Sequence, residues 1–168
     1  VSHMGQIKIW PKNNEKEKLI QALEKLMPCD LYNLKENRQT YSLLTNSNGG
    51  VIDDLMIANK DSYFQLVVNA SQKKTDYQHL KDNISQDFNI ELEENKSLLA
   101  IQGPQSEDIL VSINSNIKTM KFMDSIDISL AASSPRRAKI KIDGTVRSEL
   151  ISPKVETLQE NLKSIIEN

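Results

Sequence analysis

Apolar residues recur at helical spacing in four segments of the chain, namely 14–27, 71–86, 104–115 and 153–167. In each of them apolar side chains stand three or four positions apart, which is the pattern of an amphipathic helix with one buried face. Pro28 closes the first segment, because proline cannot continue a helix. The apolar stripe of that first segment consists of Leu19, Ile20, Leu23, Leu26 and Met27.

Short runs typical of β-strands lie between these segments. Asn48-Gly49-Gly50 separates two of the runs and predicts a tight hairpin, because such turns need residues that accept a positive φ. The order β-α-β-β-β-α-β-β, followed by a helix and further strands, indicates an α+β fold. We therefore predict a ferredoxin-like antiparallel sheet with helices packed on one face. The predicted strands are 6–10, 41–45, 51–58, 63–68, 88–93 and 97–102.

Residues 131–137, AASSPRR, are small, polar and basic, which is typical of an exposed loop or a junction between segments. We accordingly expect one unit over 1–130 and a β-β-α segment over 138–168 docked beside it.

Charge and composition narrow the possible partners. The net charge of −2 provides no basic surface for nucleic acid, and no apolar run is long enough to span a membrane, so we expect neither partner. Cys29 is the only cysteine, which excludes an internal disulfide and is compatible with a reducing, cytoplasmic location. His3 and His79 are too far apart in the sequence for metal-ligand spacing, and we predict no metal site.

Two adjacent carboxylates, Asp53 and Asp54, interrupt the apolar strand 51–58. Neighbours on a strand point to opposite faces, so these two cannot share a proton with each other. At least one must lie beside buried surface, where an ionised group is costly unless it is paired or faces a polar cavity. Such a carboxylate is either a functional acid or a structural one, with one Asp supporting the turn and the other in an ion pair. The pattern alone leaves both interpretations open.

Three sequence blocks decide between them. YSLLTNSNGGVIDDLMI at 41–57 is followed by LVVNA at 66–70 and by AIQGP at 100–104. In this order and at these intervals the blocks resemble aminomethyltransferase, the T-protein of the glycine cleavage system, and VSHMG at 1–5 matches a further motif of that family. The resemblance covers roughly residues 1–130 and is looser beyond.

The resemblance implies part of the T-protein folate-binding fold and its chemistry. T-proteins bind tetrahydrofolate and transfer a methylene group to it from the aminomethyl-lipoyl arm of H-protein, with release of ammonia. Asp54 matches the family's catalytic carboxylate, whose expected role is to orient the pterin and to stabilise positive charge. Tyr41, Met4 and Asn69 match positions that line the folate pocket. Glu149 matches the glutamate that accepts hydrogen bonds from the donor edge of the pterin.

The carboxyl-terminal third departs from the family pattern. The family's glycine-rich loop, RTGYTGEDG, is absent before Glu149, and we expect the chain to be part of a longer protein. The alternative interpretation is a shortened, non-catalytic folate-binding or assembly subunit, similar to the small subunit of sarcosine oxidase. Folate-dependent proteins of the tRNA-modification type fit less well, because their KGCYxGQ motif is absent here.

Overall fold

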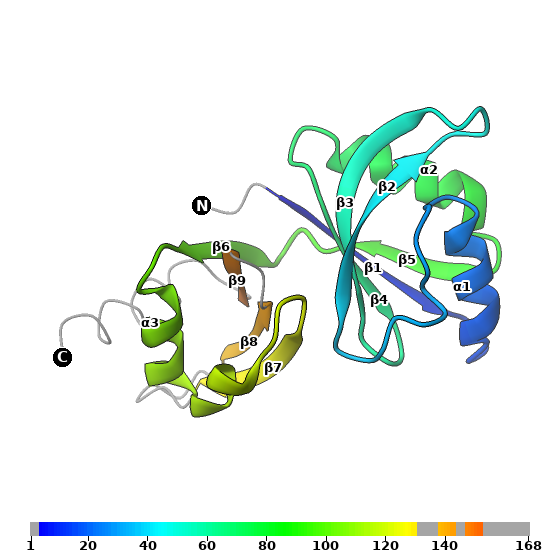
Figure 1. Cartoon of the computed structure of the whole chain (residues 1–168). Coiled ribbons are helices and arrows are strands. Elements are labelled where there is room, and N and C mark those ends of the chain that lie inside the picture. The colour runs from blue at the N-terminus through cyan, green and yellow to red at the C-terminus, as the bar shows by residue number, and fades with distance from the viewer. Residues whose placement is uncertain (1–3, 131–137, 144–146, 153–168) are drawn as a thin grey trace. The chain divides into compact units, whose positions relative to one another are not determined.

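The computed structural model describes residues 4–130, 138–143 and 147–152 of the chain (Figure 1). Contacts between residues divide the protein into two units. His3–Glu94 form the N-terminal unit, and Asn95–Asn168 belong to the C-terminal unit.

The N-terminal unit is one antiparallel sheet with two helices. The strand order is β2-β3-β4-β1-β5. With β2 set aside, the remaining order β3-β4-β1-β5 is that of a ferredoxin-like sheet, to which β2 adds one edge strand. The predicted α+β, ferredoxin-like class is therefore confirmed. The elements are β1 (Gly5–Pro11), α1 (Lys16–Glu24), β2 (Gln39–Thr45), β3 (Val51–Asn59), β4 (Phe64–Val68), α2 (Lys73–Ile84) and β5 (Phe88–Leu92).

The core lies between the sheet and the two helices. Both helices contact β1, and Figure 1 shows them on the same side of the sheet. Alternate strand residues point to this side, since side chains on a strand change face at every position. Each fully buried Leu or Ile contributes roughly 1.5–3 kcal/mol by leaving water. The side chains with no exposed surface include Ile7, Ile9, Leu19, Leu23, Leu44, Ile57, Phe64, Leu66, Val68 and Leu80.

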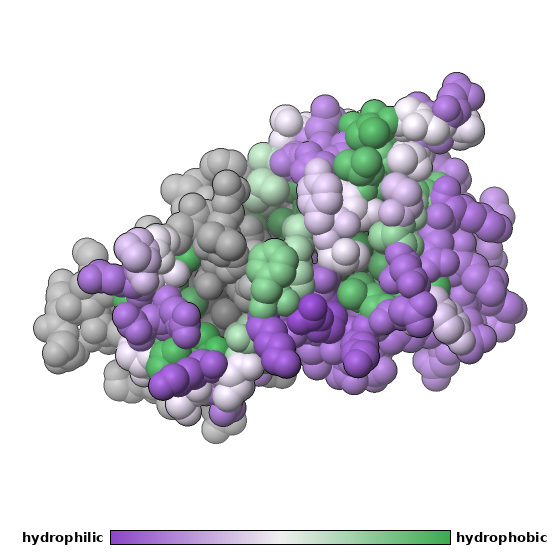
Figure 2. Space-filling model, viewed as in Figure 1, coloured by the Kyte–Doolittle hydropathy of each residue, from purple (hydrophilic) through white to green (hydrophobic). Residues whose placement is uncertain are grey.

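The outer side of α1 carries the charged and amide residues of its sequence. In the view of Figure 2 the surface over this helix is predominantly hydrophilic. This is the opposite face from the buried stripe of Leu19, Ile20 and Leu23, as the helical periodicity predicts.

The predicted hairpin joins β2 and β3. Asn46 Oδ1 accepts hydrogen bonds from the backbone N–H groups of Asn48 at 3.0 Å and Gly50 at 2.9 Å, which holds the turn closed. Gly49 has a φ of 74°, in the left-handed region that favours glycine. The hairpin prediction is confirmed, and it brings Tyr41 of β2 beside β3.

Gly5 allows α2 to approach the sheet closely. A Cβ atom at this position would overlap Lys73 Cβ at the start of α2, and it would lie 2.8 Å from Val68 Cγ2. Only glycine leaves room for this contact. The first turns of α2 therefore pack directly against the ends of β1 and β4.

The C-terminal unit contains a second antiparallel sheet, with strand order β6-β9-β8-β7. Because β9 pairs with β6 and β8 pairs with β7, β8 and β9 share a sheet with strands that precede the junction expected at 131–137. The contacts thus group the chain differently from the expected units 1–130 and 138–168. The elements are β6 (Ser97–Gln102), α3 (Ser106–Ile113), the 3₁₀ helix η1 (Ser115–Thr119), β7 (Ser125–Leu130), β8 (Ala138–Asp143) and β9 (Arg147–Ser152).

Three helices were expected within the described residues, and α1, α2 and α3 confirm them with slightly shorter bounds. The helix predicted over 153–167 lies outside the described residues. None of the helices in the described part of the chain combines the length and apolar character needed to cross a membrane.

Candidate functional site

The adjacent carboxylates of β3 lie on opposite faces of the sheet, as predicted. Asp53 is paired with Leu44, whose side chain is fully buried, so Asp53 lies on the face that the helices cover. Asp54 is paired with Leu43 and is exposed on the other face, here called the open face. Residues directly opposite each other in an antiparallel pair share a face, which fixes both assignments. The two carboxylates therefore meet different surroundings.

Asn69 connects the two carboxylates across the end of the sheet. It follows the last residue of β4, and the register that pairs Leu55 with Val68 places it beside Asp54. Its Nδ2 donates to Asp53 Oδ1 at 2.9 Å and to Asp54 Oδ1 at 3.0 Å. An amide nitrogen carries two hydrogens, so both bonds can form at once. One side chain thus orients carboxylates on both faces.

Tyr41 shares the open face with Asp54. On β2 it is paired with Met56, two residues from Asp54 along β3, and its side chain is 54% exposed. Desolvation of the phenol by its neighbours, together with the negative charge of Asp54 and a hydrogen bond to it, raises the pKa of Tyr41 above its usual value. The phenol therefore stays protonated at neutral pH and donates to the Asp54 carboxylate.

The remaining predicted site residues, Met4 and Glu149, belong to different units. Met4 is half-buried and directly precedes β1, whose pairing of Gly5 with Val68 places the Met4 backbone beside that of Asn69. Glu149 lies on β9 of the C-terminal unit, where it is paired with Ala100 of β6. The N-terminal unit thus brings together Tyr41, Asp54 and Asn69, with Met4 at the same end of the sheet. The folate-binding roles of all these residues stay predictions.

Sequence analysis missed Asp76, which lies on α2 with no exposed surface. Burial, a side-chain hydrogen bond to Asp53 and the charge of Asp53 raise the pKa of Asp76 to about 7. The sequence pattern does indicate its buried position. Asp76 precedes Leu80 and Ile84 at intervals of four residues, so it occupies the buried stripe of α2. A carboxylate on the buried side of a helix needs a partner.

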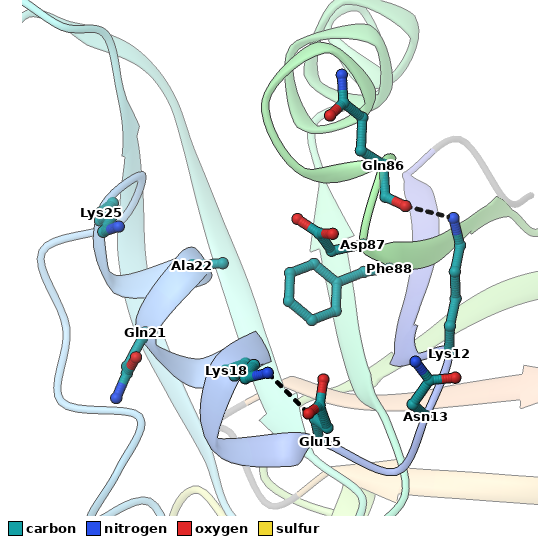
Figure 3. A pocket seen from close by; sticks show the side chains of 10 residues that line it. All are labelled: Lys12, Asn13, Glu15, Lys18, Gln21, Ala22, Lys25, Gln86, Asp87 and Phe88. Atoms are coloured by element: carbon teal, nitrogen blue, oxygen red, sulfur yellow. Dashed lines mark hydrogen bonds and ion pairs between the residues drawn. The ribbon is translucent and has the colours of Figure 1, made fainter.

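A groove of about 430 Å³ lies between α1 and the turn that precedes β5 (Figure 3). It is lined by side chains of both charges, including Lys18, which is paired with Glu15 at 2.7 Å. Lys12 closes one side by donating to the backbone carbonyl of Gln86 at 2.7 Å. None of the predicted site residues lines this groove. Within the described residues, no group of three or more His, Cys, Asp or Glu side chains is placed to hold a metal ion.

Comparisons with known proteins identify relatives of the chain. The family model described as the GCVT N-terminal domain matches residues 1–152. An aminomethyltransferase of Thermoanaerobacter sp. (strain X514) is 39% identical over 137 residues, which are 77% of this chain and 36% of the relative. A mitochondrial aminomethyltransferase of Dictyostelium discoideum is 34% identical over 141 residues, which are 78% of this chain and 34% of the relative.

A solved structure shows the same fold. The glycine cleavage system aminomethyltransferase T of Bartonella henselae matches with a TM-score of 0.77 and 24% sequence identity, over 96% of this chain and 44% of that protein. The chain spans about a third of the length of the curated relatives that it matches. The match to the domain model over most of the chain, together with these relatives, shows that the chain belongs to the aminomethyltransferase family of the glycine cleavage system.

Proposed function

We propose that the chain takes part in tetrahydrofolate-dependent aminomethyl transfer. In this reaction a methylene group passes from the aminomethyl-lipoyl arm of H-protein to tetrahydrofolate, and ammonia is released. The observation that carries the proposal is the cluster on the open face, where Asp54 is held by Asn69 and Tyr41. Lipoylated H-protein is the proposed partner and the cytoplasm the proposed location.

The open face around Asp54 suits a flat heterocycle. Such ligands need apolar walls with a few placed polar groups. Met56 is paired with both Tyr41 and Val67, so these three side chains lie beside Asp54 on one face. Met56 and Val67 are only partly buried, and Tyr41 is more than half exposed. This combination provides an apolar surface with a carboxylate at its edge.

Asp54 is the proposed catalytic residue, and its role is electrostatic. A carboxylate oxygen accepts more than one hydrogen bond, so Asp54 can accept an N–H of the pterin while Asn69 holds its Oδ1. A fixed negative charge beside the reacting nitrogens favours the transition state, in which positive charge develops. Met4 and Tyr41 are proposed as walls of the pocket, and Glu149 as a second acceptor for the donor edge of the pterin.

Isothermal titration with tetrahydrofolate tests the binding site. We expect Asp54→Asn and Asn69→Ala to weaken binding by roughly 10- to 100-fold, since a hydrogen bond to a charged group contributes about 1.5–3 kcal/mol. Asp82→Asn is a matched control, because Asp82 is an exposed carboxylate on α2 whose partner is Gln78. Lack of binding by the unmodified chain would contradict the assignment of the pocket.

Turnover needs a separate assay. Formation of 5,10-methylenetetrahydrofolate by the full chain with aminomethylated H-protein would support the enzymatic proposal. Binding of tetrahydrofolate without turnover would instead favour the non-catalytic subunit similar to that of sarcosine oxidase.

A further inference from the structure

Three buried carboxylate oxygens lie together between β3 and α2 without a donor. They are Oδ1 and Oδ2 of Asp76 and Oδ2 of Asp53, and no group in the described part of the chain donates a hydrogen bond to any of them. Asp76 has no exposed surface. Two ionised carboxylates in contact would repel each other, and burial would add the cost of desolvation to both. A single proton between the two side chains removes this conflict.

We propose that the Asp76 carboxyl keeps its proton and donates a hydrogen bond to the Asp53 carboxylate, and that this hydrogen bond positions Asn69 and, through it, Asp54. Asp76 is thus a positioning residue. The positioning role rests on the proposed function of Asp54, whereas the shared proton does not.

Two further hydrogen bonds connect Asp53 to Asp54 through Asn69. Asp53 Oδ1 accepts from Asn69 Nδ2 at 2.9 Å, while its other oxygen, Oδ2, is buried without a donor, and the Asp53 carboxylate lies within hydrogen-bonding reach of Asp76. A hydrogen bond donated by the protonated Asp76 carboxyl therefore holds the Asp53 carboxylate in the orientation that accepts from Asn69. The same Asn69 nitrogen donates to Asp54 Oδ1 at 3.0 Å. A group on the helix-covered face is in this way connected to the exposed carboxylate on the open face.

The surroundings of Asp76 contain few other charges. Lys73 and His79 lie one turn away on α2, on either side of Asp76, and neither is among the causes of its raised pKa. Asp53 is the titratable residue that faces it from β3. Within the described residues, the helix-facing positions of β1, β4 and β5 are apolar or glycine. These positions are Gly5, Ile7 and Ile9 on β1, Phe64, Leu66 and Val68 on β4, and Phe88, Ile90 and Leu92 on β5.

The state of the proton can be measured directly on the full chain by ¹³C NMR of the Asp carboxyl carbons from pH 4 to pH 9. We expect one buried carboxyl to titrate with a midpoint of about 7, its signal to be absent from Asp76→Asn, and its midpoint to fall in Asp53→Asn. Asp82→Asn should leave the titration unchanged. An Asp76 carboxyl that is ionised throughout pH 5–8 would overturn the proposal.

Positioning is read from the Asn69 side-chain amide. In Asp76→Ala, hydrogen exchange of this amide should become about tenfold faster, the factor that corresponds to the loss of one hydrogen bond. Asp76→Asn should retain slow exchange, because its amide can still donate to Asp53. Unchanged exchange in a folded Asp76→Ala variant would overturn the positioning role even if the proton is present.

The functional readout is the pH dependence of tetrahydrofolate binding. Affinity of the unmodified chain should fall several-fold as the pH rises from 6 to 8, and Asp76→Asn should abolish this dependence. A pH profile that Asp76→Asn leaves unaltered would refute the link from Asp76 to Asp54. If the unmodified chain binds no folate, the proposed function fails, while the two NMR measurements still decide whether Asp76 holds the proton and positions Asn69.

Discussion

Asp76→Asn should make the stability of the N-terminal unit less dependent on pH. The Asp76 carboxyl has an ordinary pKa of 3.8 in the unfolded chain and a pKa of about 7 in the folded one, because it is buried against Asp53. The folded state therefore binds a proton that the unfolded state releases between these two pH values. The contribution of protonated Asp76 to the free energy of unfolding is fully present below pH 4, and it is lost as the pH rises through 7.

The size of the effect follows from the difference between the two pKa values. It corresponds to roughly 4 kcal/mol in total, or about 1.4 kcal/mol per pH unit between pH 4 and pH 7. Asn at position 76 has nearly the same shape, donates to Asp53 and does not titrate. We expect the variant and the unmodified chain to have similar free energies of unfolding at pH 4. At pH 8 the variant should be the more stable by up to roughly 4 kcal/mol.

Urea unfolding followed by tryptophan fluorescence measures this difference. Trp10 is the only tryptophan of the chain and lies on β1, so its emission reports on the N-terminal unit. Asp82→Asn removes the same charge from an exposed position of α2 and should show no comparable change with pH. If the difference between Asp76→Asn and the unmodified chain is constant from pH 4 to pH 8, Asp76 does not carry the proton and the reasoning is refuted.

Three further predictions concern packing and reactivity. Gly5→Ala should lower the free energy of unfolding by about 1–3 kcal/mol, because the new Cβ would overlap Lys73, and a urea midpoint equal to that of the unmodified chain would contradict this close approach. Leu23→Ala should cost about 2–5 kcal/mol in the same assay, since Leu23 has no exposed surface, and a cost below 1 kcal/mol would show that the core collapses around the site. Cys29 should react with iodoacetamide at pH 7.5 more slowly in the folded chain than in urea, because burial raises the pKa of its thiol, and equal rates would exclude that shielding.

Local sequence patterns were sufficient to predict the helices and the β2–β3 hairpin of the N-terminal unit. Helical periodicity located α1 and α2, and Asn48-Gly49-Gly50 located the hairpin, because both signals depend on neighbours within a few residues. Strand alternation also placed Asp53 and Asp54 on opposite faces, which the register of β2 and β3 confirms. The family blocks then singled out Asp54 and Asn69, and these two residues are hydrogen-bonded in the structure.

Contacts between segments that are distant in the sequence could not be predicted from local patterns. The pairing of β6 with β9 joins residues about 50 positions apart, and it groups the strands differently from the expected junction at 131–137. Nothing in the local composition of either strand specifies its partner, since pairing depends on how the whole sheet assembles.

The chemistry of the site shows the same division between local pattern and tertiary packing. Sequence alone determined that Asp53 and Asp54 occupy opposite faces of β3, because the two-residue period of a strand leaves no other choice. Which of the two faces the helices cover was decided by the tertiary structure. Only the tertiary structure decided that Asp76 meets Asp53, since this contact depends on α2 packing against the sheet, to which Gly5 lets the start of the helix approach closely. It also decided that Asn69, lying just beyond the end of β4, reaches carboxylates on both faces. The protonation of a buried carboxyl depends on such three-dimensional neighbours, and no periodicity along the chain encodes it.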